Sequence, residues 1–167
     1  MLALYISDIK DFMNKFLIGD IFDSFYVREV SITTFNTFTI DGRLQKDFFD
    51  TDTAAALIES GRLYSRWKDI KSFCYSIIKG KRTPLSFQAV LQLPAQKLEK
   101  TLTAQAPGVS PESISGLYLN IRYKDKILIC TTGISFHTFV PDKRPGLIWD
   151  QIVSDFFQKH QIVCEER

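Results

Sequence analysis

The sequence predicts an α+β domain with a mostly antiparallel sheet of six to seven strands and three to four helices packed mainly on one face. The run Ser31–Ile40 is almost entirely β-branched or aromatic, and such side chains favour extended backbone. Elsewhere, apolar residues at helical spacing alternate with stretches of strict two-residue alternation. Short turn-like segments join most of these stretches, which favours antiparallel neighbours.

The 167 residues are most simply one domain, spanning residues 1–167. A chain of this length hides roughly 70% of the surface that its unfolded form exposes, which is enough for a substantial core. Hydrophobic residues make up 45% of the chain and charged residues 24%, so the composition is that of a folded globular protein. Fourteen residues are Phe, which form either an aromatic core or an exposed binding surface.

The N-terminal elements follow from capping signals. Residues 1–6 predict a short strand. A helix follows, which Ser7 or Asp8 can cap and Gly19 ends.

A long hairpin is predicted next. Residues 25–40 are extended and bend once, since a typical strand is shorter. Asp41-Gly42 offers the positive φ angles of a tight turn, so residues 43–49 are predicted to return as the partner strand. The register stays open between a two-residue and a three-residue loop.

The middle of the chain holds helical signals of different strength. Residues 51–65 are the least regular stretch, with a helical turn at Ala54–Ile58. Residues 67–78 carry apolar side chains at helical spacing, and Gly80 ends that helix.

The second half of the chain predicts further sheet. A strand of clear alternation runs to Leu93, and Pro94 begins a helix that ends near Gln105. Residues 106–115 are predicted to be a flexible loop. A meander of three strands follows, at residues 117–123, 127–132 and 134–140. A last amphipathic helix carries Ile148 to Phe156, and the order of elements leaves room for one parallel strand pair.

Charge and cysteine content exclude several classes of protein. The formal net charge is only +2, so no global field favours nucleic acid. The charge is uneven, because residues 66–100 hold eight basic and two acidic residues, whereas residues 41–60 hold two basic and five acidic ones.

Three dispersed cysteines form no disulfide framework and no metal motif. With no signal peptide and no membrane-spanning stretch, the chain is expected in the cytoplasm.

Catalytic signatures are absent from the sequence. It contains no glycine-rich phosphate loop, nucleophile elbow or zinc-protease motif, and only two histidines, so we expect no metal and no cofactor. His137, on a predicted strand, is the one candidate general base. An enzyme of this kind would use Arg43 or Arg122 to hold an anion, and these side chains would converge on one pocket with His137.

Two groups of polar residues suggest ligand binding. Asp41 and Arg43 flank the glycine of the predicted hairpin, and Asn120 and Arg122 share one face of a strand, where they could line a pocket for a small anionic molecule. Ordinary turn chemistry and the wet face of a sheet explain the same residues.

Lys79, Lys81 and Arg82 form the densest basic cluster, just past a helix C-terminus. Cations are favourable there without any ligand. The cluster could also bind nucleic acid. Further basic residues could extend it if the fold brings them close, namely Arg122, Lys124, Lys126, Lys143 and Arg144.

Seven stretches of the chain carry a recognisable pattern, namely Ile32–Phe38, Ile40–Gly42, Lys46–Phe48, Trp67–Ile70, Ile78–Leu85, Leu119–Tyr123 and Cys130–Gly133. Together they resemble an uncharacterised domain-of-unknown-function family of small single-domain proteins from Firmicutes, especially gut clostridia. The resemblance spans nearly the whole chain and implies a bacterial cytosolic origin. It implies no activity, cofactor or catalytic residue.

The leading hypothesis is therefore a non-enzymatic cytosolic binding module for a protein partner or a small anionic ligand. The alternatives are a small enzyme with His137 as base and a nucleic-acid-binding protein that uses the Lys79–Arg82 cluster. No membrane partner is expected. Homo-oligomerisation through an exposed strand edge is possible.

Overall fold

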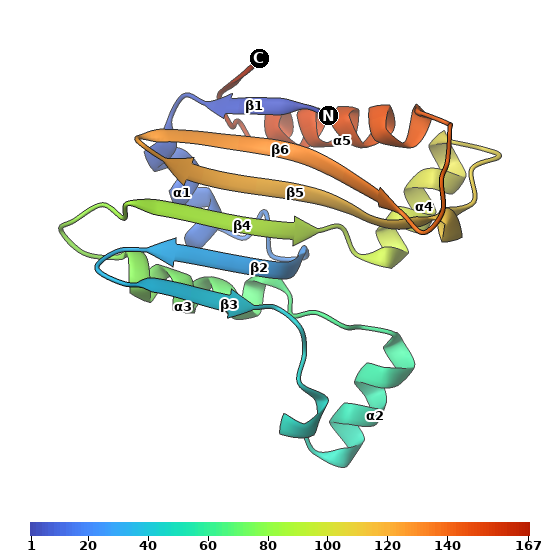
Figure 1. The fold of residues 1–167 in the computed structure, drawn as a ribbon, viewed down its shortest axis with the longest axis horizontal. Helices are drawn as coiled ribbons and strands as arrows, with labels where there is room; N and C mark the ends of the chain where they lie inside the picture. Colours follow the sequence, from blue (N-terminus) through green and yellow to red (C-terminus); the bar gives the residue numbers. More distant parts are fainter.

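A seven-stranded antiparallel sheet organises the computed structural model, which describes all residues from Met1 to Arg167 (Figure 1). The strands lie in the order β3-β2-β4-β5-β6-β1-β7. Their bounds are β1 Ala3–Ile6, β2 Tyr26–Thr33, β3 Thr37–Asp41, β4 Ser86–Gln92, β5 Ile114–Lys124, β6 Ile127–Phe136 and β7 Cys164–Glu166.

Five α-helices and two short 3₁₀ turns complete the fold. They are α1 Ile9–Leu17, α2 Thr51–Ser60, α3 Trp67–Ile78, α4 Ala95–Gln105, α5 Arg144–Lys159, η1 Lys46–Phe48 and η2 Pro111–Ser113. None of the helices combines the length and apolar character needed to cross a bilayer.

The core lies between one face of the sheet and four of the helices. Alternate side chains of the central strands, such as Phe87, Ala89 and Leu91 of β4, are buried there together with residues from α1, α3, α4 and α5. Trp67 of α3 anchors this layer, because its indole stacks on Phe16 at 4.1 Å between ring centroids and its Nε1–H donates to the Phe16 carbonyl at 2.7 Å. The opposite face of the sheet carries no helix and stays open (Figure 1).

The α+β class predicted from the sequence is confirmed. The structure has one helix more than predicted, because α2 is a full ten-residue helix rather than a single turn. Every neighbouring strand pair is antiparallel, so the parallel pair for which the sequence left room does not occur.

The predicted position of the long hairpin is wrong. β2 turns into β3 through Thr34–Asn36, with Thr33 paired to Thr37, and residues 43–49 form η1 and no strand. Gly42 has no positive φ angle. Its lack of a side chain is needed because a Cβ there would lie 1.8 Å from the Val27 carbonyl oxygen. The glycine therefore permits close passage of two backbones, which the Asp-Gly pair alone cannot reveal.

The predicted three-strand meander is also wrong, because β6 runs unbroken through Gly133, which pairs with Tyr118 of β5. The β5–β6 turn is confirmed where the sequence predicts it. Asp125 and Lys126 adopt φ angles of 52° and 64° there, and two successive left-handed residues are typical of a tight hairpin.

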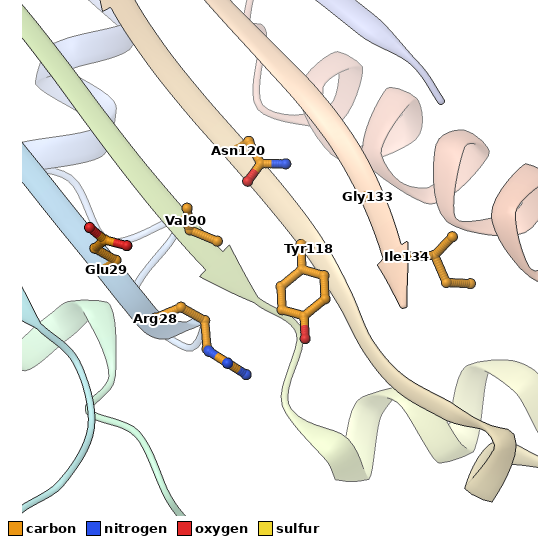
Figure 2. Close-up of a pocket in the computed structure, with 7 residues that line it drawn as sticks. All are labelled: Arg28, Glu29, Val90, Tyr118, Asn120, Gly133 and Ile134. Atoms are coloured by element: carbon orange, nitrogen blue, oxygen red, sulfur yellow. The ribbon is translucent and has the colours of Figure 1, made fainter. Parts of the chain in front are cut away.

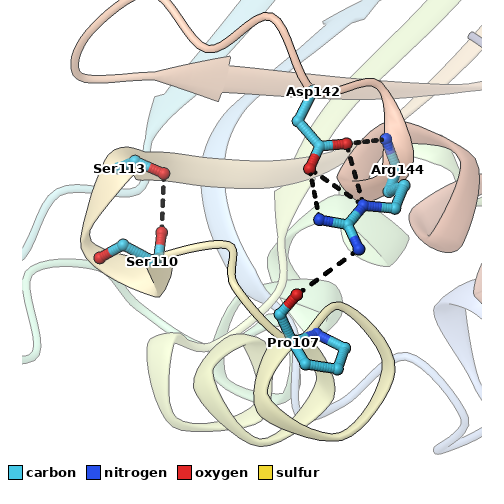
Figure 3. Close-up of polar contacts among 5 residues, drawn as sticks. All are labelled: Pro107, Ser110, Ser113, Asp142 and Arg144. Carbon is cyan, nitrogen blue, oxygen red and sulfur yellow. Dashed lines mark hydrogen bonds and ion pairs between the residues drawn. The ribbon is translucent and has the colours of Figure 1, made fainter.

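The loop after α4 is held to the start of α5 by Arg144 (Figure 3). Its guanidinium binds the Asp142 carboxylate, with Nη2 2.7 Å from Oδ2, and Nη1 donates to the Pro107 carbonyl at 3.5 Å. The hydrogen bonds that Arg144 donates to the Asp142 carboxylate lower the pKa of Asp142. Arg144 is paired with Asp142 at the start of α5. This end of the sheet lies opposite the α3–β4 loop that holds Lys79–Arg82, so Arg144 does not extend that cluster (Figure 1).

Candidate functional site

A pocket of about 420 Å³ lies on the open face of the sheet, over strands β2, β4, β5 and β6 (Figure 2). Its walls combine charged, amide, aromatic and aliphatic groups, from Arg28, Glu29, Val90, Tyr118, Asn120, Gly133 and Ile134.

A β-bulge in β2 explains why two charged residues meet in this pocket. Val27 pairs with Leu91 and Glu29 pairs with Val90, so Arg28 is an extra residue without a partner of its own. A bulge breaks the strict alternation of side chains and re-aims the residues beside it. Val27 is buried in the core, while Arg28 and Glu29 both line the pocket on the open face.

Arg28 is the residue held most firmly in the pocket. Its guanidinium carbon lies 4.3 Å from the centroid of the Tyr64 ring and 5.7 Å from that of Tyr118. Its Nη1 donates to Gln92 Oε1 at 3.1 Å. No carboxylate lies within ion-pair distance of the guanidinium, so the side chain is a fixed cation without a counter-ion.

The floor of the pocket is shaped by Gly133 and its neighbours on β5. A Cβ at Gly133 would lie 3.5 Å from Asn120 Nδ2 and 3.7 Å from Tyr118 Cβ, so a side chain there would fill space over both residues. Tyr118 Oη accepts a hydrogen bond from Ser135 Oγ at 3.3 Å. The half-buried Asn120 amide makes no side-chain hydrogen bond within the protein, which leaves its donors and acceptor available.

Of the four ligand residues predicted from the sequence, the structure brings only Asn120 into this pocket. Arg122 lies two residues further along the same face of β5 and is exposed. Asp41 ends β3, where its carboxylate accepts the Arg43 N–H at 2.9 Å, and Arg43 forms an isolated bridge to Tyr64. No sequence signal pointed to Arg28, because a bulge depends on how two strands pair.

The structure does not bring His137 together with the predicted anion-binding arginines. The residue is exposed beyond the end of β6, where its N–H donates to the Ser113 carbonyl at 2.9 Å. Arg122 lies eight residues along β5 from Ile114, which corresponds to roughly 26 Å of strand. The prediction that His137 and Arg122 converge on one pocket is therefore wrong, because the β5–β6 register places them at opposite ends of the pair.

Lys79, Lys81 and Arg82 lie together after α3 and line a second hollow of about 460 Å³, away from the Arg28 pocket. All three are exposed, and none forms an ion pair. Phe35 and Leu85 line the same hollow and are 87% and 69% exposed.

Comparison with known families gives one match. A family model described as a family of unknown function, DUF5721, matches residues 15–165. No curated protein and no solved structure matches the chain. The resemblance to a domain-of-unknown-function family is thus confirmed, while the bacterial origin stays a prediction.

Proposed function

The chain belongs to the DUF5721 family of unknown function, and we propose that it is a non-enzymatic cytosolic module that binds a small ligand bearing an anionic group. The ligand lies on the open face of the sheet, in the pocket built around Arg28. Three free cysteines support a reducing compartment such as the cytoplasm.

The observation that carries the proposal is the state of Arg28. A guanidinium held by two tyrosine rings and a glutamine has already lost much of its rotamer freedom. Binding of an anion therefore causes little further loss of side-chain conformational entropy. Because no carboxylate neutralises it, an anion gains charge-assisted hydrogen bonds without displacing an internal partner. The neutral amide of Asn120 supplies further donors on the same floor.

Other walls of the pocket restrict the rest of the ligand. Val90 offers apolar surface, and the Tyr118 ring offers a flat face. Exposed Glu29 repels a second anionic group and favours a hydrogen-bond donor at that side. The pocket thus suits a compact molecule with one anionic end and an apolar or aromatic body.

Titration of ¹⁵N-labelled protein with phenyl phosphate and benzoate tests the proposal, with benzyl alcohol as the uncharged comparison. We expect the anionic probes to shift the amide resonances of Arg28, Tyr118 and Asn120, and benzyl alcohol to bind far more weakly. Arg28→Gln removes a charge-assisted contact of about 1.5–3 kcal/mol, which corresponds to a loss of affinity of roughly 10-fold to 150-fold.

Arg122→Gln is the matched control, because it removes one positive charge from the same face outside the pocket. It should change the affinity of the probes little. Equal weakening by the two substitutions would show that general charge attraction, and no Arg28 site, binds the anions. Absence of shifts around the pocket with both anionic probes would refute the proposal.

A further inference from the structure

Residues 44–63, here called the arm, project from the body of the protein (Figure 1). The arm contains η1 and α2. Its two ends are joined where the Leu44 N–H donates to the Leu63 carbonyl at 2.9 Å, and Arg62 at its base forms an ion pair with Asp69 of α3, with Nη2 3.5 Å from Oδ2. Helix α2 has no buried residue. The arm therefore folds without support from the core.

The arm is nevertheless well formed. Asp50 caps α2, since its Oδ1 accepts the Thr53 N–H at 2.7 Å, and Gly61 ends the helix in the left-handed conformation with φ 69°. An isolated helix of fewer than about 12 residues is only marginally stable in water, and most helices gain their stability from packing. A ten-residue helix with both ends capped and no core contact lacks the packing partner that would stabilise it.

The arm carries exposed apolar side chains that a packing partner would bury. Phe48 is 85% exposed, Ile58 60% and Leu63 43%. These exposed side chains offer a docking partner apolar surface to bury.

The hollow beside Lys79, Lys81 and Arg82, here called the basic groove, has the complementary character. Its apolar surface comes from Phe35, Leu85 and the end of α3, and its three cations are without carboxylate partners. The arm holds the opposite charge, with four acidic residues against two basic ones. One of those two, Arg62, is already paired with Asp69.

The fold separates these two surfaces within one molecule. The arm leaves the sheet after Asp41, which pairs with Glu29 near the start of β2. The groove lies at the other end of β2, where Thr33 pairs with Ser86 and the Leu85 N–H donates to the Thr33 carbonyl at 2.8 Å. The arm also points away from the sheet (Figure 1), so it does not cover the groove of its own chain.

We propose that the arm of one copy of this chain docks into the basic groove of a second copy. Apolar groups on both sides are buried, and the carboxylates of the arm face the free cations of the groove. A symmetric arm-to-arm contact would bring like charges together. Each copy presents one arm and one groove at opposite ends of β2, so the copies associate either by reciprocal exchange of arms across a twofold axis or head-to-tail into rings and open chains.

Sedimentation velocity of two variants and their mixture tests the proposal. The arm variant carries Phe48→Ser and Ile58→Ser, and the groove variant carries Lys81→Glu and Arg82→Glu. Wild type should associate as concentration rises, and less so at high salt. Each variant alone should be monomeric at the same concentrations. An equimolar mixture should form a dimer and nothing larger, because one intact arm then meets one intact groove.

Two control variants each carry a single change of the same kind elsewhere on the surface. Phe139→Ser removes a phenylalanine that is 90% exposed, and Lys100→Glu reverses an exposed cation on α4. Both should associate as wild type does, and circular dichroism should show that all four variants are folded.

Three outcomes would overturn the proposal. Monomeric wild type at every concentration would exclude self-association. Association lost in the arm variant but kept in the groove variant would indicate a symmetric arm contact. Nucleic acid that copurifies with wild type and is absent from the groove variant, without any protein oligomer, would assign the groove to nucleic acid.

Discussion

Replacing Gly42 by alanine tests whether this glycine serves a turn or a close approach of two backbones. In the structure, a Cβ at this position would lie 1.8 Å from the Val27 carbonyl oxygen and 2.6 Å from its carbon. Both atoms belong to the backbone of a fully buried residue in β2, so they cannot move aside as the end of a flexible side chain would. The chain must therefore shift at Gly42 itself.

That shift disturbs two backbone hydrogen bonds. The Gly42 N–H donates to the Arg28 carbonyl at 3.1 Å, and the Gly42 carbonyl accepts from the Ser65 N–H at 2.8 Å. Strain from forced packing costs about 1–3 kcal/mol, and each weakened hydrogen bond costs about 1 kcal/mol. We expect Gly42→Ala to lower the free energy of unfolding by about 3 kcal/mol, and the Tm by roughly 6–12 °C for a chain of this size.

Urea denaturation followed by circular dichroism measures the change, with Gly61→Ala as the control. Gly61 has φ 69° and nothing within 4 Å of the position that a methyl group would take, so alanine there costs only the left-handed backbone, about 1 kcal/mol. A turn glycine would behave like Gly61 and would also tolerate asparagine, which adopts positive φ readily. If Gly42→Asn is near wild type and Gly42→Ala costs no more than Gly61→Ala, the close-approach reasoning fails.

Three further predictions concern buried and titrating groups. Thr132→Val should lower the free energy of unfolding by about 1–3 kcal/mol, because the buried hydroxyl accepts the Leu2 N–H at 2.8 Å and valine leaves that donor unpaired; thermal denaturation measures this. Burial raises the pKa of the Cys74 thiol to about 12, so iodoacetamide at pH 8 should label the half-buried Cys164 first and Cys74 only in urea, as peptide mass spectrometry would show. The pKa of Asp142 is lowered in the folded protein. Its ion pair therefore stabilises the fold fully at pH values above the ordinary pKa of 3.8, and this stabilisation is lost as the pH falls through the lower pKa of the folded state. Asp142→Asn should flatten the acid limb of a curve of unfolding free energy against pH.

Signals within short stretches of sequence were sufficient to predict most of the helices and strands. Asp8 caps α1 as predicted, with its Oδ1 accepting the Asp11 N–H at 3.0 Å, because a cap depends only on residues three apart. Helix α3 and strand β4 follow from the spacing of their apolar residues, since one buried face fixes the period of each element. The open polar face of the sheet, including Asn120 and Arg122, could be predicted for the same reason.

Contacts between segments remote in sequence decided the features of the fold that local sequence did not predict. Gly133 stands inside a strand although glycine weakens strands, and its pairing with Tyr118 of β5 keeps β6 continuous there.

The sequence by itself determined the α+β class, the main helices and the polarity of each sheet face, since these depend on side-chain type and periodicity along a short stretch of chain. Only the tertiary structure decided where the chain reverses, that Arg28 is the extra residue of a bulge, and that the acidic arm and the basic groove lie apart. Each of these depends on the pairing of segments remote in sequence, and the free energy of that pairing is distributed over many contacts that no short motif records.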